Sequence, residues 1–387
     1  MITPKIPYPL HSGADIVTFN TIKYLSRRGY KITLLSIMDS DSSHYDELKR
    51  WCEVHPILKN TDNTIWGAML NLFSKTPYTI SKYQTPKLIS KIKQVMKKEK
   101  FDIVHIEHLH MAYYRKFTRK GLPVFLRMHN VETTIMERFY RQQKNPLSKI
   151  YSFIQWKKLH EYESQAVEKF SRCIVITDVD KERLQSMNPK PVYRSIPAGV
   201  DISYFHPINC KEEPYSIVFV GSLDWFPNVD GICWFCKKVF PFIKAKVPEA
   251  KLYIVGRNPP IRVKKLENKN VVILGFVKDI REWLAKSNVS IVPLRIGSGI
   301  RIKILEALAM GIPVVSTSIG CEGIEVINGK EILIANEEKA FAKDILSLLQ
   351  DENYAKRLRE NGLKLVRDRY SWDEIAKKFE EVYKCGK

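Results

Sequence analysis

Short apolar runs rich in β-branched residues alternate with longer segments of helical periodicity along almost the whole sequence. This alternation predicts parallel sheets, because a strand that is followed by a helix returns to pair in parallel with the strand before it. We expect strands at residues 31–37, 102–106, 123–128, 173–177, 216–221, 251–256, 271–275, 289–294 and 313–317. We expect helices at residues 14–28, 85–98, 147–170, 178–187, 229–247, 280–287, 302–310 and 372–383.

A stretch rich in proline and polar residues divides the chain of 387 residues into two similar halves. We expect a doubly wound, Rossmann-like α/β domain over residues 1–197, a linker over 198–214 and a second such domain over 215–369. A chain of this length buries enough surface to fold without disulfides.

Cysteine usage and hydropathy indicate a cytoplasmic protein. The seven cysteines are scattered, which is typical of reduced thiols in a cytosolic compartment. No apolar run reaches the roughly 18 residues that a membrane span needs. Residues 1–12 lack the apolar core of a signal peptide.

The formal net charge of +21 is concentrated in the first half of the chain. Such a field favours phosphates, nucleic acid or an anionic membrane surface as partners. Residues 82–100 carry seven lysines and one acid, with apolar residues at helical spacing. This amphipathic helix either packs its apolar stripe on the core or contacts anionic lipid headgroups at the inner face of the cell membrane. Nucleic acid is a poorer fit, because no aromatic residues are interleaved with the lysines.

The segment that follows the expected strand 289–294 has the features of an anion site. Gly297 and Gly299 allow close approach of the backbone to a ligand and precede a helix whose first N–H groups are free. Arg301 and Lys303 lie at the start of that helix, where the helix dipole opposes cations. Two cations at this end therefore favour a polyanion, most simply a diphosphate held by amides, Arg and Lys together.

Glu306 lies one turn after Lys303, where a carboxylate can accept hydrogen bonds from ribose hydroxyls. The alternative is a surface ion pair between these two residues. Two more strand ends, at Gly221–Ser222 and at residues 9–13, precede helices in the same way. The alternative is that these loops are ordinary strand–helix connections that bind no ligand, since such connections have the same form.

His129 directly follows the expected strand 123–128 and should point from its end toward the site, unless it makes only a local hydrogen bond at the start of a helix. We expect no metal site. The histidines of the HIEHLH run, His105, His108 and His110, have no acid or cysteine at metal-binding spacing. The Cys233–Cys236 pair lies in an apolar helical stretch, which favours core cysteines over a redox or zinc pair.

Together these segments resemble the family 4 glycosyltransferases. The matching runs of the second half are FVGSLDWFPNVDGI, KLYIVGRNP, VVILGFVKDIREWLAKSNVSIVPL and GSGIRIKILEALAMGIPVVST, and those of the first half include PYPLHSGADIVTFN, DIVHIEHLH and RMHNVET. The resemblance covers nearly the whole chain and is closest to sugar transferases of surface-polysaccharide assembly. It implies the GT-B fold, with two Rossmann-like domains facing a cleft and a C-terminal helix, 370–387, that packs back on the first domain.

The resemblance also implies roles for individual residues. Glu306 matches the family's ribose-binding glutamate, His129 a histidine near the donor sugar, and Gly13 a glycine-rich loop near the donor phosphate. Four further positions match loops around the nucleotide: Gly221, Gly256, Phe276 and Val277.

The sequence departs from the family at two places. Ser298 replaces the usual glutamate eight positions before the ribose glutamate, and Ser222 and the region of Asn228 stand where an arginine and a lysine are usual. Arg301 and Lys303 would then supply the charge that holds the diphosphate. With His129, they are the residues that we expect to act in catalysis.

The resemblance implies a hexosyltransferase that retains anomeric configuration and needs neither cofactor nor metal, since the nucleotide sugar is a substrate. We expect the acceptor to be a saccharide, carried on a lipid, and we expect no nucleic-acid partner. Two alternatives remain: a GT-B-fold sugar-nucleotide epimerase, and a non-catalytic basic protein that binds a membrane or nucleic acid on the same scaffold.

Overall fold

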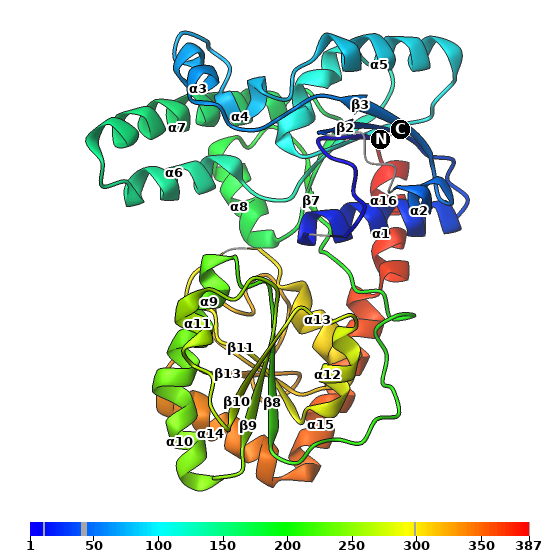
Figure 1. The fold of residues 1–387 in the computed structure, drawn as a ribbon. Coiled ribbons are helices and arrows are strands. Elements are labelled where there is room, and N and C mark those ends of the chain that lie inside the picture. Colours follow the sequence, from blue (N-terminus) through cyan, green and yellow to red (C-terminus); the bar gives the residue numbers. More distant parts are fainter. Residues whose placement is uncertain (11, 40–44, 298, 387) are drawn as a thin grey trace. The chain divides into compact units, whose positions relative to one another are not determined.

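The structure is a computed structural model that describes the chain except for residues 11, 40–44, 298 and 387 (Figure 1). Its internal contacts divide the chain into two compact units. Unit 1 comprises Met1–Pro197 and Ala376–Lys387, and unit 2 comprises Ala198–Ile375. Residues 198–214, which we expected as a separate linker, are grouped with unit 2, and the chain returns to unit 1 at Ala376 rather than at residue 370.

Unit 1 is built on a seven-stranded sheet in the order β3-β2-β1-β4-β5-β6-β7, and its strands pair in parallel. The strands are β1 (Ile2–Thr3), β2 (Thr33–Met38), β3 (Glu53–Leu58), β4 (Val104–Glu107), β5 (Val124–Met128), β6 (Arg172–Val175) and β7 (Tyr193–Ser195). Strands β2, β4 and β5 are buried along their whole length, as the centre of a sheet covered on both faces requires.

The helices of unit 1 follow the strands in the βα alternation. They are α1 (Gly13–Arg27), α2 (Asp46–Lys49), α3 (Ile65–Asn71), α4 (Tyr78–Ser81), α5 (Pro86–Lys98), the 3-10 segment η1 (Leu109–Phe117), α6 (Glu132–Gln142), α7 (Pro146–Val167) and α8 (Asp178–Met187). In α5, Leu88, Ile92 and Val95 pack into the core, so its apolar stripe is used inside the protein and its lysines form the outer face.

Unit 2 is built on a six-stranded parallel sheet in the order β10-β9-β8-β11-β12-β13. Its strands are β8 (Ser216–Val220), β9 (Lys251–Val255), β10 (Val271–Gly275), β11 (Val289–Val292), β12 (Val314–Ser316) and β13 (Leu333–Ile334). Its helical segments are α9 (Phe226–Trp234), η2 (Phe235–Val239), α10 (Phe240–Lys246), α11 (Ile261–Lys264), α12 (Ile280–Lys286), α13 (Ile302–Ala309), α14 (Glu338–Gln350), α15 (Glu352–Leu365) and η3 (Val366–Tyr370). Figure 1 shows α9, α10 and α14 on one side of this sheet and α12 and α13 on the other, and each group packs into its own core cluster.

The last helix, α16 (Trp372–Lys384), begins in unit 2 and ends in unit 1. Ser371 caps it, with its Oγ accepting a hydrogen bond from the backbone N–H of Glu374 at 3.4 Å. Phe379 and Tyr383 are buried in unit 1. No helix among the described residues is long and apolar enough to cross a bilayer.

One expected helix has a different form. Residues 229–247 were expected as a single helix, but helical structure starts at Phe226 and contains the π-helical turn η2 before Pro241. Proline lacks an N–H and its ring excludes the carbonyl four residues earlier, so the regular α ladder cannot run through it. Cys233 and Cys236 pack against the core of unit 2, as expected.

Both sheets contain one reversal of strand order. In unit 1 it lies between β1 and β4, and in unit 2 between β8 and β11. The connections leave toward opposite sides at such a point, and this opens a crevice at the carboxyl ends of the two strands. A ligand-binding site is therefore expected among the loops that follow β1, β4, β8 and β11.

Candidate functional site

In unit 2, Lys303 reaches across the strand-order reversal. It comes from α13, the helix after β11, and its Nζ donates a hydrogen bond to Asn228 Oδ1, in the helix after β8, at 2.9 Å. A Cβ at Gly221 would collide with Lys303 Nζ and Asn228 Nδ2. A side chain at Gly221 would displace the ends of these two side chains, so the Lys303 ammonium and the Asn228 amide both lie against the turn at the end of β8.

Gly256 is required by close packing against backbone. Its position at the end of β9 leaves no room for a Cβ, which would collide with the carbonyl oxygen of Gly221. The two glycines thus bring the ends of β8 and β9 close together beneath the Lys303 ammonium.

Arg301 occupies the N-cap position of α13 and folds back over the loop before it. Its NH1 donates to the carbonyl of Gly299 at 2.7 Å, and its guanidinium lies 5.6 Å from the ring centroid of Trp225. Gly297 and Gly299 have φ values of 142° and 82°, a region that favours glycine. Ser298, the expected family departure, lies outside the described residues.

The charges at this edge are only partly compensated. Burial, aided by the nearby charge of Arg301, lowers the pKa of Lys303 to about 7. Burial raises the pKa of Glu306 to about 7, although Lys303 opposes the shift. Among the described residues the alternative ion pair between Lys303 and Glu306 does not form, and Lys303 donates a hydrogen bond to Asn228 instead. A bound anion would restore the charge of Lys303, and hydroxyl donors would stabilise the ionised form of Glu306.

A third cation at this edge, Arg257, was not predicted from the sequence. Its Nε donates to Ser222 Oγ at 3.2 Å, and it pairs with Asp224 at 3.4 Å. The available signal was its position directly after Gly256, at the end of a strand. Phe276 and Val277 follow β10 at the sheet edge, with Phe276 78% exposed and Val277 half-buried.

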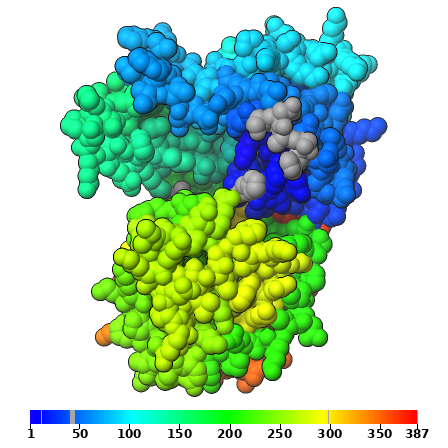
Figure 2. Space-filling view, in the orientation of Figure 1, coloured from blue at the N-terminus to red at the C-terminus, as the bar shows by residue number. Residues whose placement is uncertain are grey.

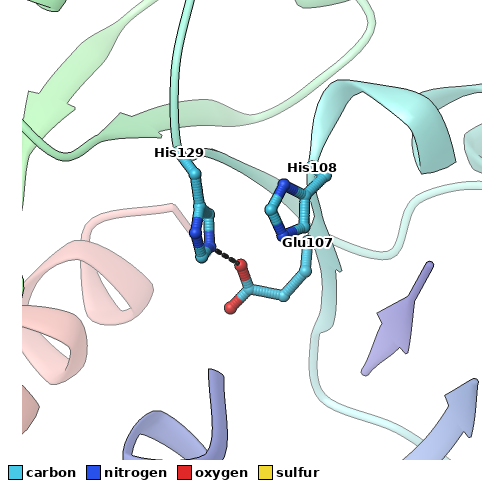
Figure 3. A group of neighbouring side chains, drawn as sticks. All are labelled: Glu107, His108 and His129. Carbon is cyan, nitrogen blue, oxygen red and sulfur yellow. Dashed lines mark hydrogen bonds and ion pairs between the residues drawn. The ribbon is translucent and has the colours of Figure 1, made fainter. Parts of the chain in front are cut away.

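In unit 1 the central contact joins Glu107 and His129. Glu107 ends β4 and His129 follows the adjacent strand β5, so both leave the same edge of the sheet. His129 Nε2 lies 2.7 Å from Glu107 Oε2, the contact drawn as a dashed line in Figure 3. His129 thus lies at a strand end as expected, but a buried carboxylate holds its ring.

Glu107 also gathers the neighbouring buried groups. Although burial opposes ionisation, Arg127 and His105 keep the pKa of Glu107 well below its usual range. His105 Nε2 lies 3.1 Å from Glu107 Oε1, and Arg127 NH1 lies 3.6 Å from it. Because the ionised carboxylate only accepts, both His105 and His129 donate from Nε2.

This network extends to the C-terminal helix. Burial lowers the pKa of His105, so its ring is neutral and its Nδ1 can accept a hydrogen bond. The hydroxyl of Tyr383, on α16, lies 2.6 Å from that atom. The last helix therefore contributes a donor to the chain of hydrogen bonds that ends at His129.

A single group of three possible metal ligands occurs in the described part of the chain: Glu107, His108 and His129, with ligand atoms within 4.8 Å of one another. The two rings are stacked, with centroids 3.9 Å apart and planes at 28° (Figure 3). The hydrogen bond of His129 to Glu107 joins one ring nitrogen and one carboxylate oxygen of this group. Glu107 is therefore an acid within reach of two histidines, contrary to the prediction that the HIEHLH run has no acid at metal-binding spacing.

Gly13, the expected phosphate-loop glycine, is the first residue of α1, after β1. The cap of this helix is already satisfied. Ser12 Oγ accepts from Asp15 N at 3.2 Å, and Ser12 N donates to Asp15 Oδ2 at 3.0 Å.

The structure thus groups the expected residues in two clusters, each within one unit. Gly221, Gly256, Arg301, Lys303 and Glu306 lie around the strand-order reversal of unit 2, and His129 lies at the sheet edge of unit 1. Four partners are not predicted from the sequence: Arg127, Tyr383, Arg257 and Glu107, which is the acid inside the HIEHLH run itself.

Family comparisons cover both units. Residues 11–204 match the model described as Glycosyltransferase Family 4, and residues 214–351 match the model described as Glycosyl transferases group 1. The Escherichia coli protein named UDP-Gal:alpha-D-GlcNAc-diphosphoundecaprenol alpha-1,3-galactosyltransferase is 24% identical over 86% of this chain and 81% of its own length.

Solved structures show the same fold. Sucrose-phosphate synthase from Thermosynechococcus elongatus matches with a TM-score of 0.71 and 16% identity, over 99% of this chain and 98% of that one. The Anabaena protein Alr3699/HepE in complex with UDP-glucose matches with a TM-score of 0.66 and 14% identity, over 99% and 98%. The fold is therefore GT-B, as expected.

The hydrogen bond from Tyr383 to His105 gives a stability prediction. Tyr383→Phe leaves the buried Nδ1 of His105 without its donor, which should cost about 1–3 kcal/mol of unfolding free energy. Hydrogen exchange of the β4 and β5 amides measures this loss within unit 1. Tyr45→Phe, at a half-buried tyrosine of the same unit, is the control and should leave exchange unchanged. Equal exchange in both variants would mean that the Tyr383 hydroxyl does not support the network.

Proposed function

The chain belongs to Glycosyltransferase Family 4 and is a glycosyltransferase, and we propose that it moves a hexose from a nucleotide sugar to a lipid-linked saccharide in polysaccharide biosynthesis. The observation that carries the proposal is the Lys303 ammonium at the strand-order reversal of unit 2, with Glu306 one turn later. A bound diphosphate would stabilise the protonated form of the buried Lys303. The Glu306 carboxylate, one helical turn later, could then accept hydrogen bonds from the ribose hydroxyls.

UDP-hexoses are the donors to test first. The similar E. coli enzyme carries UDP-Gal in its name, and HepE was solved with UDP-glucose. The same E. coli name gives a diphosphoundecaprenol-linked saccharide as acceptor. This supports a membrane-bound acceptor for the present chain and peripheral attachment to the membrane.

We propose that transfer retains anomeric configuration by front-face displacement. The bond from the anomeric carbon to the β-phosphate oxygen breaks with its electron pair going to that oxygen. The acceptor oxygen bonds to the same face of the carbon and gives its proton to the departing phosphate. Lys303, Arg301 and the first amides of α13 stabilise the charge that develops on the leaving diphosphate. His129, fixed by Glu107, contacts the donor sugar.

The proposed reaction needs no metal. Lys303 and Arg301 supply the positive charge that a divalent cation supplies elsewhere.

The direct test is transfer from UDP-glucose, UDP-galactose and UDP-N-acetylglucosamine to GlcNAc-diphosphoundecaprenol, with the product anomer assigned by NMR. One donor should give a product with the donor's α configuration, at a rate unchanged by EDTA. His129→Ala should lower kcat by about 100-fold, because it removes one group aimed at the reacting sugar, while UDP affinity stays unchanged. His160→Ala, at an exposed histidine of α7, is the control.

Each part of the proposal can fail separately in that assay. A β product contradicts retention, and loss of rate in EDTA contradicts metal independence. A changed sugar nucleotide formed without acceptor contradicts transfer and indicates an epimerase. An equal loss of UDP affinity and kcat in His129→Ala contradicts the role near the sugar.

The pKa of Lys303 predicts how UDP affinity depends on pH. Above about pH 7 the free protein loses the proton on Lys303. Binding of UDP must then be accompanied by uptake of a proton on Lys303. The Kd of UDP should therefore rise by up to about tenfold per pH unit toward pH 9. Lys303→Arg keeps its charge over this range and should flatten the profile. Lys303→Ala should bind weakly at every pH and lose turnover.

Calorimetric titrations from pH 7 to pH 9 measure this dependence. Ionisation of Glu306 occurs in both the wild type and Lys303→Arg, so the difference between their profiles isolates Lys303. Identical profiles would show that the lysine does not contact the diphosphate.

A further inference from the structure

The short helix α3 of unit 1 presents its apolar side chains outward. Ile65, Trp66, Met69 and Leu70 are 80%, 75%, 53% and 71% exposed, and Phe73, just after the helix, is 93% exposed. We call these five residues the α3 surface. A surface helix normally turns such residues toward the core, so this exposure is unusual.

Polar contacts hold α3 in this orientation. Its one buried residue is Asn71, which accepts a hydrogen bond from Gln155 Nε2 at 2.9 Å and donates to the carbonyl of Thr76 at 2.9 Å. Lys158 Nζ donates to the carbonyls of Asn71 and Leu72, each at 2.9 Å. The side-chain amide of Asn71 and the carbonyls at the C-terminal end of α3 therefore fix this helix to α7, and the apolar side chains of α3 face solvent. Figure 2 shows this part of the chain, in blue at the upper left, with its outer side uncovered in that view.

The nearby turns of α7 add to the exposed apolar area. Leu147 and Ile150, in the first turns of α7, are 79% and 59% exposed. They precede Gln155 and Lys158, the residues that hold α3, on the same helix.

The surrounding sequence is basic without any acid. Residues 63–98 contain seven lysines and residues 138–158 six lysines and arginines, and neither stretch contains Asp or Glu. In α5 the apolar stripe is buried and lysines form the outer face, so α5 can add charge but has no apolar face to insert.

From this combination we infer that the α3 surface is a membrane-docking surface, which inserts into the interface of a bilayer that carries anionic lipids. Trp and Phe side chains prefer the headgroup boundary, and lysines around them bind anionic headgroups. A second copy of this chain would bring the same cations face to face. A lipid surface of opposite charge complements both stretches.

The inference deepens the proposed lipid-linked acceptor by naming the surface that would hold the enzyme at the membrane. Its test does not depend on transfer, because the assay contains neither donor nor acceptor. Failure to bind vesicles would leave the transfer proposal standing, and failure of transfer would leave docking standing.

The test is co-sedimentation with vesicles of equal parts phosphatidylcholine and phosphatidylglycerol, compared with pure phosphatidylcholine vesicles. The wild type should bind the anionic vesicles, more weakly in high salt. The double variant Leu70→Ser, Phe73→Ser should lose at least tenfold in vesicle affinity. Its matched control is Phe242→Ser, Ile261→Ser in unit 2, where the replaced residues are 42% and 72% exposed, and this control should bind like the wild type.

Three results would overturn the inference. The wild type could fail to bind anionic vesicles, or the α3 double variant could bind them like the control. Size-exclusion chromatography could also reveal a dimer that the α3 double variant converts to monomer, which would assign the surface to self-association. Because all four replaced side chains are exposed, thermal unfolding of both variants should match the wild type.

Discussion

Parallel pairing at the two reversals of strand order is the constraint on which the functional regions depend. In each sheet, two neighbouring strands send their connections to opposite faces, and the residues that follow them meet at one edge. Lys303 reaches Asn228 because β8 and β11 are neighbours at the reversal of unit 2. Glu107 follows the reversal of unit 1 at the end of β4, and it meets His129 because the next strand, β5, pairs in parallel with β4. Glycines at these ends remove side chains that would otherwise fill the space.

Buried charges are compensated within the protein in unit 1 but only partly so in unit 2. This difference fits a rigid support in unit 1 and a ligand site in unit 2. In unit 1 the Glu107 carboxylate has Arg127 and two histidines around it, so its charge is compensated within the protein and His129 is held in one orientation. Removing one partner from such a buried group costs several kcal/mol, which favours a rigid support. In unit 2, burial moves the pKa values of Lys303 and Glu306 toward 7, so a ligand can supply the charges and hydroxyls that the protein does not.

The sequence predicts the strand–helix alternation well where the strands are apolar throughout. It predicts β2, β4, β5 and β6 and every strand of unit 2 except β13. It misses β3, which contains Pro56 and a mixture of polar and apolar residues, and β7 and β13, which have only three and two residues. Lys303 and His129 can be predicted as site residues from their local positions, since Lys303 lies at the start of a helix and His129 at the end of a strand. Glu107 and Tyr383 cannot, because their contacts depend on strand order and on the return of α16 to unit 1.

Thermal unfolding with UDP, GDP, ADP or CMP tests whether the edge of unit 2 around Lys303 and Glu306 binds a nucleotide. A nucleotide at 100 times its Kd stabilises a protein by about 2.7 kcal/mol, which is a measurable shift. We expect one nucleotide to raise the unfolding temperature. This shift should be lost in Glu306→Ala and kept in Glu249→Ala, at an exposed glutamate. No shift with any nucleotide, or the same shift in Glu306→Ala, would contradict a nucleotide site at this edge.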